Sequence, residues 1–362
     1  MKCSIIMKSH TSQDGANTAI RTQPYEGLSR DELLRLYRTM LLSRRLDDKE
    51  IQLKNQSKSF FQISGAGHEA ILVAAGMLLK PSHDWFFPYY RDRALCLTLG
   101  LAPYEMLLAA VGSKADPSSG GRQMPAHWSK PDLHLVSGSS ACATQCLHAV
   151  GCAEACQFYL QFPNITTQTA SRSEDSVVYV SVGDGATSEG EFWESLNTAC
   201  TRRLPVVFLV EDNGYAISVP VEIQTPGGDI AKLVSAFPGL EVISVDGTDA
   251  LASYAAMQRA LTYARGGRGP VLVKASVVRL YSHSMSDDER QYKSEVELNE
   301  EKSRDPLRRF STFLTHEQLA DVDTLERIAS DVDDEIQDAT ERALAAETPD
   351  RSTALDYVYS PD

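Results

Sequence analysis

Apolar positions form two patterns in the middle of the chain. Short runs that are apolar throughout are typical of strands buried in a parallel sheet, and apolar residues at helical spacing occupy segments between them. These patterns predict strands over 176–182, 205–211, 240–245 and 270–278, with helices over 188–200 and 249–265. The alternation predicts an α/β fold, a parallel sheet flanked by helices.

Helical spacing also marks both ends of the chain. Ser29 is a suitable N-cap for a long helix, and a second helix is expected over 67–79. Residues 1–27 are polar and aperiodic, which predicts a flexible N-terminal arm. We therefore expect an α/β domain over 28–314 and an acidic helical C-terminal tail, 315–362, packed on that domain.

Charge argues against two classes of partner. The chain has 362 residues and a formal net charge of −14, whereas nucleic acids and anionic membranes bind basic surfaces. Its longest apolar runs, such as 70–79, are too short to span a bilayer. The N-terminus lacks the sustained apolar core of a secretory signal. We expect a cytoplasmic protein that binds neither nucleic acid nor membrane.

Four cysteines lie close together in one segment. Zinc sites usually have other spacings than the four-residue intervals found here. Small residues at helical intervals surround the cysteines, which favours a closely packed helix in which cysteine acts as a small apolar residue. The cysteines are Cys142, Cys146, Cys152 and Cys156.

A glycine turn follows the first predicted strand. Asp184 stands between Gly183 and Gly185, and Asn213 follows the next strand. If these strands are neighbours, they lie about 4.8 Å apart and end at the same edge of the sheet, so the two side chains can converge. A carboxylate and an amide oxygen suit Mg²⁺ or Ca²⁺. The alternative is an aspartate that serves only the turn.

The same turn is suited to an anion. Ser188 and Glu191 match a capping box, which predicts that a helix begins here. Amides at a helix start favour an anion, and glycine allows a close approach. A diphosphate held by a cation and by the helix start therefore fits. The turn lacks the third glycine of a dinucleotide fingerprint, and the chain has no Walker A lysine motif.

The stretch from the glycine turn to Asn213 resembles the thiamine diphosphate motif. From about residue 28 to 292, the chain resembles the alpha chain of the decarboxylating component of 2-oxo acid dehydrogenases. The GRQMPAH form is more similar to branched-chain than to pyruvate enzymes. The resemblance implies the diphosphate-binding half of a thiamine-diphosphate-binding fold. Other matching stretches are FFPYYRDR (86–93), GGRQMPAHW (120–128), SGSSACATQ (137–145) and SHSMSDDERQY (282–292).

The resemblance implies a role for each matching residue. His283 would be catalytic and would lie beside the diphosphate and the substrate. The Mg²⁺ ligands would be Asp184, Asn213 and the carbonyl of Tyr215, and a potassium ion would bind Ser139, Thr144 and Gln145. Cofactor contacts would come from Tyr90, Arg91, Ser140, Cys142, Gly183, Gly185, Ala186, Asn213 and His283, and the substrate pocket would include Phe60 and Phe61 unless these belong to the core.

Two residues depart from the family pattern. Asp212 stands where the family often has asparagine, and it adds negative charge near the diphosphate unless it points away or becomes a ligand. Ala141 replaces a proline, which leaves the potassium loop less constrained. Arg91 is expected to bind phosphate, and the alternative is a surface ion pair with Asp92.

The resemblance implies oxidative decarboxylation of a 2-oxo acid of the branched-chain (2-oxoisovalerate) type, with acyl transfer to the lipoyl group of a partner acyltransferase. Pyruvate and acetoin dehydrogenase alpha chains are alternatives within the family. A nicotinamide-dependent oxidoreductase and a non-catalytic scaffold subunit are alternatives outside it. One sheet unit supplies half of the cofactor site, so a separate beta subunit is expected, with two alpha and two beta chains. A phosphate on Ser284 would repel the cofactor's diphosphate.

Overall fold

One parallel sheet of five strands organises the chain in the computed structural model, which describes residues 24–162 and 175–359. The strand order is β1-β2-β3-β7-β6, and every neighbouring pair is parallel. The strands are β1 (Trp85–Phe87), β2 (Val178–Gly183), β3 (Val206–Asp212), β6 (Glu241–Asp246) and β7 (Val271–Ser276). The predicted α/β fold is confirmed. Strand β1 was not predicted, because three residues are too few for a periodic signal.

Helices precede or follow each strand, and a short antiparallel hairpin joins Tyr215–Ala216 (β4) to Val219–Pro220 (β5). Within the described residues, no helix combines the length and the apolar composition needed to cross a membrane. The helices are α1 (Arg30–Asn55), α2 (Glu69–Leu78), α3 (Arg93–Leu99), α4 (Pro103–Ala110), α5 (Thr144–Gln161), α6 (Gly190–Arg202), α7 (Val221–Gln224), α8 (Ile230–Val234), α9 (Ala250–Arg265), α10 (Glu295–Ser303), α11 (Pro306–His316) and α12 (Val322–Ala345), and a 3₁₀ turn, η3, spans Asp184–Ser188.

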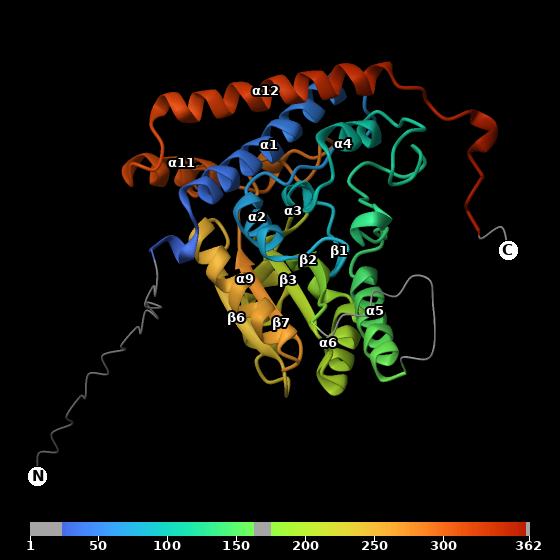
Figure 1. Cartoon of the computed structure of the whole chain (residues 1–362), viewed down its shortest axis with the longest axis vertical. Helices are drawn as coiled ribbons and strands as arrows, with labels where there is room; N and C mark the ends of the chain where they lie inside the picture. Colours follow the sequence, from blue (N-terminus) through green and yellow to red (C-terminus); the bar gives the residue numbers. More distant parts are fainter. Residues whose placement is uncertain (1–23, 163–174, 360–362) are drawn as a thin grey trace, which may run out of the picture.

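Both faces of the sheet are covered, which explains why its strands are apolar throughout. Side chains alternate between faces along β3: Val207 and Leu209 join the core on the side of α1, α2 and α9, whereas Val206 and Phe208 join the core on the side of α5 and α6. Figure 1 shows α9 and α5 on different sides of the strands. The sheet therefore meets solvent mainly at its edges and at its strand ends.

Helix α1 begins where the sequence predicts, and α6 does not. Ser29 caps α1 and forms a reciprocal capping box with Glu32. The predicted capping box of Ser188 and Glu191 is wrong, because Ser188 belongs to η3 and Glu189 is the N-cap of α6 without a side-chain cap. The helical turn that begins at Asp184, within the glycine turn itself, is thus η3 rather than α6.

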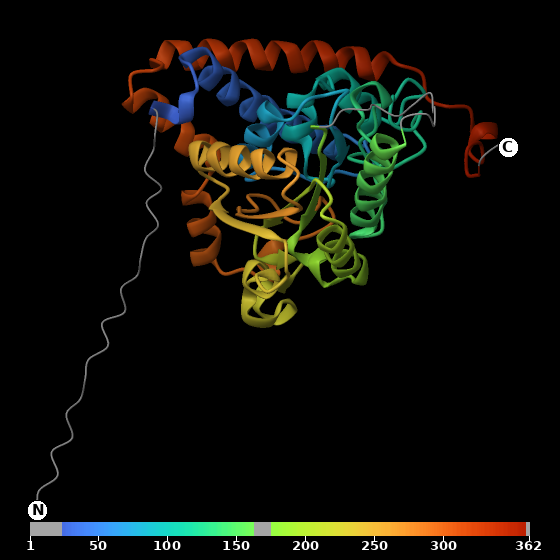
Figure 2. The same cartoon turned by 60° about the horizontal axis from the view of Figure 1, so that its bottom comes forward.

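The C-terminal region packs against the N-terminal helices. The tail predicted to be helical from residue 315 begins with the end of α11 at His316, and its main helix, α12, begins at Val322 with Asp321 as its N-cap. Helix α12 lies along α1 and α4 at one end of the molecule (Figures 1 and 2). Val332 and Ile336 are buried in that contact. The division into a domain over 28–314 and a tail stays a prediction, and its boundary falls inside α11.

The predicted N-terminal arm lies mostly outside the described residues, which begin at residue 24. Its last residues form a short 3₁₀ turn, Pro24–Gly27. The Tyr25 ring packs edge-on against Phe313, with 5.8 Å between ring centroids. This turn therefore contacts α11, and the flexible arm stays a prediction.

Helix α5 contains three of the four clustered cysteines. Cys146 is buried and Cys152 and Cys156 are half-buried, whereas Cys142 is exposed before the helix begins. In residues 24–162 and 175–359, no group of three or more His, Cys, Asp or Glu side chains is placed to hold a metal ion. The helical interpretation of the cysteine segment is confirmed from Thr144 onward.

Candidate active site

The carboxyl ends of the strands bring the predicted site residues to one edge of the sheet. Tyr90 and Arg91 follow β1, Asp184 follows β2, Asn213 follows β3, and His283 lies on the loop after β7. These four strands are consecutive in the sheet order. Ligands of open parallel sheets bind beyond the carboxyl ends of strands, so this edge is the candidate site.

Asp184 is buried, and only one of its two carboxylate oxygens is engaged. Oδ1 accepts the backbone N–H of Asn213 at 3.3 Å, whereas Oδ2 has no hydrogen-bond partner among the described residues. Burial and, secondarily, the charge of Asp212 raise the pKa of Asp184 to about 7. Buried oxygens without a donor are rare, and a hard cation is a suitable partner. The donor set therefore fits Mg²⁺.

Asn213 faces Asp184 from the neighbouring strand. Strands β2 and β3 pair with Gly183 opposite Glu211, which confirms that the two strands are adjacent. Asn213 is buried, and its Oδ1 accepts the backbone N–H of Tyr215 at 3.3 Å. The structure thus brings the three predicted metal residues into one short region, and their ligation of a metal stays a prediction.

Both glycines of the turn are required by close neighbours. A Cβ at Gly183 would lie 2.7 Å from the Tyr89 hydroxyl, and a Cβ at Gly185 would lie 2.8 Å from the Cβ of Ala216. Contacts below 3.0 Å force a neighbour to move. A side chain of α7 also stabilises the turn, because Gln224 Nε2 donates to the carbonyl of Asp184 at 2.8 Å. The glycine turn is therefore closely packed on both sides.

Asp212, the first departure from the family pattern, forms an ion pair with a lysine. Its Oδ2 lies 3.1 Å from Nζ of Lys274 on β7, and its Oδ1 accepts the backbone N–H of Gly214 at 3.1 Å. The carboxylate is thus paired. Lys274 offsets part of the negative charge that Asp212 adds to the site, and the remaining effect is the raised pKa of Asp184.

Arg91 is 1% exposed, which excludes the alternative of a surface ion pair with Asp92. Its Nη1 donates to the carbonyl of Ser64 at 2.5 Å, and its Nη2 donates to Nδ1 of His283 at 3.1 Å. The guanidinium lies over the ring of Tyr90, 5.2 Å from the centroid. Its Nε has no partner among the described residues. A buried guanidinium stays charged, and its Nε–H is available to an anion.

His283 is half-buried, and Arg91 determines which ring nitrogen carries the proton. A guanidinium only donates, so Nδ1 accepts and the neutral ring carries its proton on Nε2. Burial, followed by the positive charges of Arg91 and Arg279, lowers the pKa of His283 to about 4. The backbone N–H of His283 donates to Oδ2 of Asp287 at 2.9 Å. At neutral pH the ring therefore offers an uncharged N–H.

The neighbouring Ser284 is buried, and its hydroxyl lies 2.9 Å from that of Ser286.

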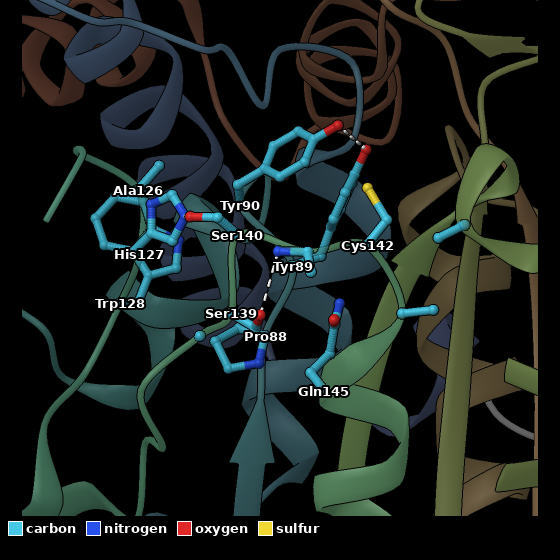
Figure 3. A pocket seen from close by; sticks show the side chains of 14 residues that line it. Pro88, Tyr89, Tyr90, Ala126, His127, Trp128, Ser139, Ser140, Cys142 and Gln145 are labelled. Atoms are coloured by element: carbon cyan, nitrogen blue, oxygen red, sulfur yellow. Dashed lines mark hydrogen bonds between the residues drawn. The ribbon is translucent and has the colours of Figure 1, made fainter. Parts of the chain in front are cut away.

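A pocket lies beside the glycine turn, between the loop after β1, the loop around residue 127 and the loop before α5 (Figure 3). Thr144 is not among the residues that line it. The predicted site residues that line the pocket are Tyr90, Ser139, Ser140, Cys142, Gln145 and Ala186. The structure thus gathers four of the nine predicted cofactor contacts from three segments into one cavity, and the other five, Arg91, Gly183, Gly185, Asn213 and His283, do not line it.

One of the predicted potassium ligands, Gln145, has a buried acceptor oxygen without a partner among the described residues. Gln145 donates from Nε2 to the carbonyl of Ser181 at 3.1 Å, and its buried Oε1 has no partner in the described part of the chain. Ser139 Oγ accepts the backbone N–H of Ala141 at 3.2 Å, a bond that proline at this position cannot form. Ala141 therefore ties the loop by a hydrogen bond in place of a proline ring. The potassium site stays a prediction.

Phe60 and Phe61 have different environments. Phe60 is 88% exposed, whereas Phe61 is half-buried against the main core. Neither residue lines the pocket of Figure 3. Their segment runs beside the His283 loop, because Met285 donates its N–H to the carbonyl of Gln62 at 3.2 Å. The core alternative is wrong for Phe60, and a substrate role for either residue stays a prediction.

Three further residues contact the site, and the sequence analysis missed them. Tyr89 donates its hydroxyl hydrogen to the Tyr90 hydroxyl at 2.8 Å, and His127 lies 2.7 Å from Ser140 (Figure 3). Both stand within the matching stretches 86–93 and 120–128, which was a usable signal. Gln224 lies in no motif, so nothing in the sequence indicated its contact with the turn.

Comparison with known proteins gives consistent matches over most of the chain. The model of the family described as dehydrogenase E1 component matches residues 37–352. The 2-oxoisovalerate dehydrogenase subunit alpha of Bacillus subtilis (strain 168) is 34% identical over 334 residues, which cover 92% of this chain and 97% of that protein. The 3-methyl-2-oxobutanoate dehydrogenase subunit alpha of Mycobacterium tuberculosis (strain CDC 1551 / Oshkosh) is 36% identical over 84% of this chain and 76% of its own. The pyruvate dehydrogenase E1 component subunit alpha of Bacillus subtilis (strain 168) is 32% identical over 88% of this chain and 79% of its own.

Proposed function

The chain belongs to the dehydrogenase E1 component family, and from this we propose that it is the alpha subunit of a branched-chain 2-oxo acid dehydrogenase that uses thiamine diphosphate. The reaction is the oxidative decarboxylation of a 2-oxo acid, with transfer of the acyl group to a lipoyl group. Two of the relatives are named for 2-oxoisovalerate and for 3-methyl-2-oxobutanoate. These names support a branched-chain substrate.

The observation that carries the proposal is the unpartnered Oδ2 of Asp184, buried at the end of β2. Without a cation, burial favours the protonated acid at this position. A bound Mg²⁺ would keep the carboxylate ionised. The other ligands in this proposal are the Asn213 side chain and the carbonyl of Tyr215, with the diphosphate completing the coordination.

The residues of the chain have separate tasks around the cofactor. When bound, thiamine diphosphate supplies the electron sink that lets the 2-oxo acid release CO₂. Arg91 would offer its free Nε–H to the terminal phosphate, and the backbone at Gly185 and Ala186 would line the diphosphate. His283 offers its neutral Nε2–H on the substrate side, where it orients the reacting group. Phe60 and Phe61 are proposed to border the acyl side chain.

A potassium ion is proposed to steady the loop before α5. Its ligands are Ser139, Thr144 and Gln145, and the free Oε1 of Gln145 supports the assignment. The same loop carries Ser140 and Cys142 into the cofactor pocket. An ordered loop here lowers the entropy that cofactor binding would otherwise cost.

The partners follow from the role of an alpha subunit. The described residues contain one parallel sheet and one glycine turn of this type. A beta subunit therefore supplies the other half of the cofactor site, and two alpha and two beta chains form the assembly. A lipoyl-bearing acyltransferase receives the acyl group. The cytoplasmic location stays a prediction.

Pyruvate is the alternative substrate, because the pyruvate dehydrogenase relative is almost as similar as the branched-chain relatives. The family match favours these two functions over an acetoin dehydrogenase, which none of the relatives above represents. It also favours them over a nicotinamide-dependent oxidoreductase and over a non-catalytic scaffold, since the described chain keeps the buried acceptor at Asp184.

One experiment tests the proposal. The chain is purified alone and with its beta subunit, thiamine diphosphate is titrated calorimetrically with and without Mg²⁺, and decarboxylation is assayed with an artificial electron acceptor. We expect Mg²⁺-dependent binding and turnover only in the complex, with a higher kcat/KM for 3-methyl-2-oxobutanoate than for pyruvate. Turnover by the lone chain would overturn the shared site, and a preference for pyruvate would overturn the substrate assignment.

A further inference from the structure

A histidine and a serine of the connection between α4 and α5, 13 positions apart, meet inside the cofactor pocket. The Nε2 atom of His127 lies 2.7 Å from Oγ of Ser140. His127 belongs to the loop between α4 and α5, and Ser140 belongs to the loop just before α5. Both side chains line the cavity of Figure 3, together with Tyr90 and Ala186. The pair therefore adjoins the residues proposed to bind the diphosphate.

The partners of His127 determine the direction of this hydrogen bond. Its Nδ1 lies 3.1 Å from the carbonyl oxygen of Met124 and 3.3 Å from that of Pro125. Carbonyl oxygens only accept, so Nδ1 carries the proton of the neutral ring and Nε2 is the acceptor. Ser140 then donates its hydroxyl hydrogen to Nε2. The lone pairs of Ser140 Oγ are left for a donor in the pocket.

Backbone strain on both sides of the pair shows that the fold holds this arrangement. Ala126, directly before His127, has a φ of 66°, and Ala143, three residues after Ser140, has a φ of 65°. Both alanines are buried and line the same pocket. The left-handed conformation is unfavourable for a residue with a Cβ, and such strain is concentrated at functional sites.

We propose that His127 is a positioning residue that fixes the Ser140 hydroxyl as a hydrogen-bond acceptor for the N–H-bearing aminopyrimidine end of thiamine diphosphate. The proposal rests on the proposed function, because it takes thiamine diphosphate as the occupant of the pocket. Tyr90 and Ala186, which are proposed to contact the diphosphate, line one side of this pocket. The aminopyrimidine end of the cofactor is therefore the part that would reach Ser140. His127 contacts only Ser140 and backbone carbonyls in the polar contacts described, so it acts through Ser140.

The test measures cofactor binding in the assembled enzyme. Thiamine diphosphate is titrated calorimetrically, with Mg²⁺ present, into wild type and into His127→Ala, Ser140→Ala and the double variant. We expect each single variant to weaken binding about five- to tenfold, the loss of one hydrogen bond, and the double variant to weaken it no further. His127→Gln retains an acceptor oxygen and is expected to bind within about twofold of wild type.

The controls separate the hydrogen bond from folding and from the proposed function. His148→Ala, on the exposed side of α5 and outside the pocket, is expected to bind like wild type. Normal binding by His127→Ala, additive losses in the double variant, or a His127→Gln as weak as His127→Ala would each overturn the positioning role. Failure of the wild-type complex to bind thiamine diphosphate would instead overturn the proposed function.

Discussion

The ammonium of Lys274 lies 3.1 Å from the carboxylate of Asp212 and joins the end of β3 to β7. Both side chains are mostly buried, with 15% of Lys274 and 10% of Asp212 exposed. Lys274 also lies 3.6 Å from Asp229, the N-cap of α8. One lysine thus contacts two carboxylates next to the proposed metal site.

The pairing of Asp212 predicts the effect of removing Lys274. Lys274→Met leaves a mostly buried carboxylate unpaired, which we expect to lower the free energy of unfolding by about 3 kcal/mol. It also leaves an uncompensated negative charge near Asp184, so thiamine diphosphate should bind more weakly. Urea unfolding and calorimetry measure both effects. The double variant Asp212→Asn/Lys274→Met is expected to recover most of the loss, and a double variant as impaired as the single one would contradict the charge argument.

The buried acceptor at Asp184 predicts a metal-dependent loss of cofactor binding. Asp184→Asn removes the negative charge that Oδ2 presents, so the affinity for thiamine diphosphate should fall at least about 100-fold. Excess Mg²⁺ should restore part of it by mass action. Asp249→Asn is the matched control, because Asn caps α9 as well as Asp does. Calorimetry that shows equal binding by the two variants would refute the metal assignment.

The tight packing of Gly185 predicts that even one methyl group disturbs the site. Gly185→Ala places a Cβ 2.8 Å from that of Ala216, and we expect a loss of stability of about 1–3 kcal/mol with weaker cofactor binding. Gly190→Ala is the matched control, because a Cβ there meets nothing within 4 Å and alanine is favourable in a helix. Unfolding curves that place both variants at wild-type stability would show that the turn has room to adjust.

The contact between Arg91 and His283 predicts how the histidine titrates. The pKa of His283 is lowered to about 4 by burial and by Arg91 and Arg279, against about 6.5 in an unfolded chain. Protonation therefore opposes folding: the contribution of this ring to stability is intact above about pH 6.5 and is lost as the pH falls toward about 4. In the cofactor-free protein, NMR of labelled histidine rings should show one signal, absent in His283→Gln, that stays neutral from pH 8 to 5. A midpoint above pH 6 for that signal would be inconsistent with the buried, Arg91-bound ring.

The sequence by itself determined four of the five strands of the sheet and the place of its chemistry. Strands β2 and β3 are buried on both faces, so their runs 178–182 and 206–210 contain only apolar residues and one serine, and that pattern is visible in a short window. The glycine turn at Asp184 and the polar Asn213 follow those runs directly. Because neighbouring parallel strands end at one edge, their position along the chain was enough to predict that they meet. The long α1 was predicted for the same local reason, since its N-cap and its periodicity are adjacent in sequence.

Only the tertiary structure decided which distant side chains are partners. Arg91 and His283 are separated by 192 positions, and Asp212 pairs with a lysine on a strand reached through β6 and α9. Such pairs leave no periodic or spacing signal, because any arginine or lysine can satisfy a carboxylate or an imidazole wherever the fold brings them together. Local sequence was also misleading at Ser188, where the packing of η3 against the end of β2 prevailed over a matching capping motif. The hydrogen bond between His127 and Ser140 likewise depends on two strained alanines, whose left-handed backbone is favourable only in the complete fold.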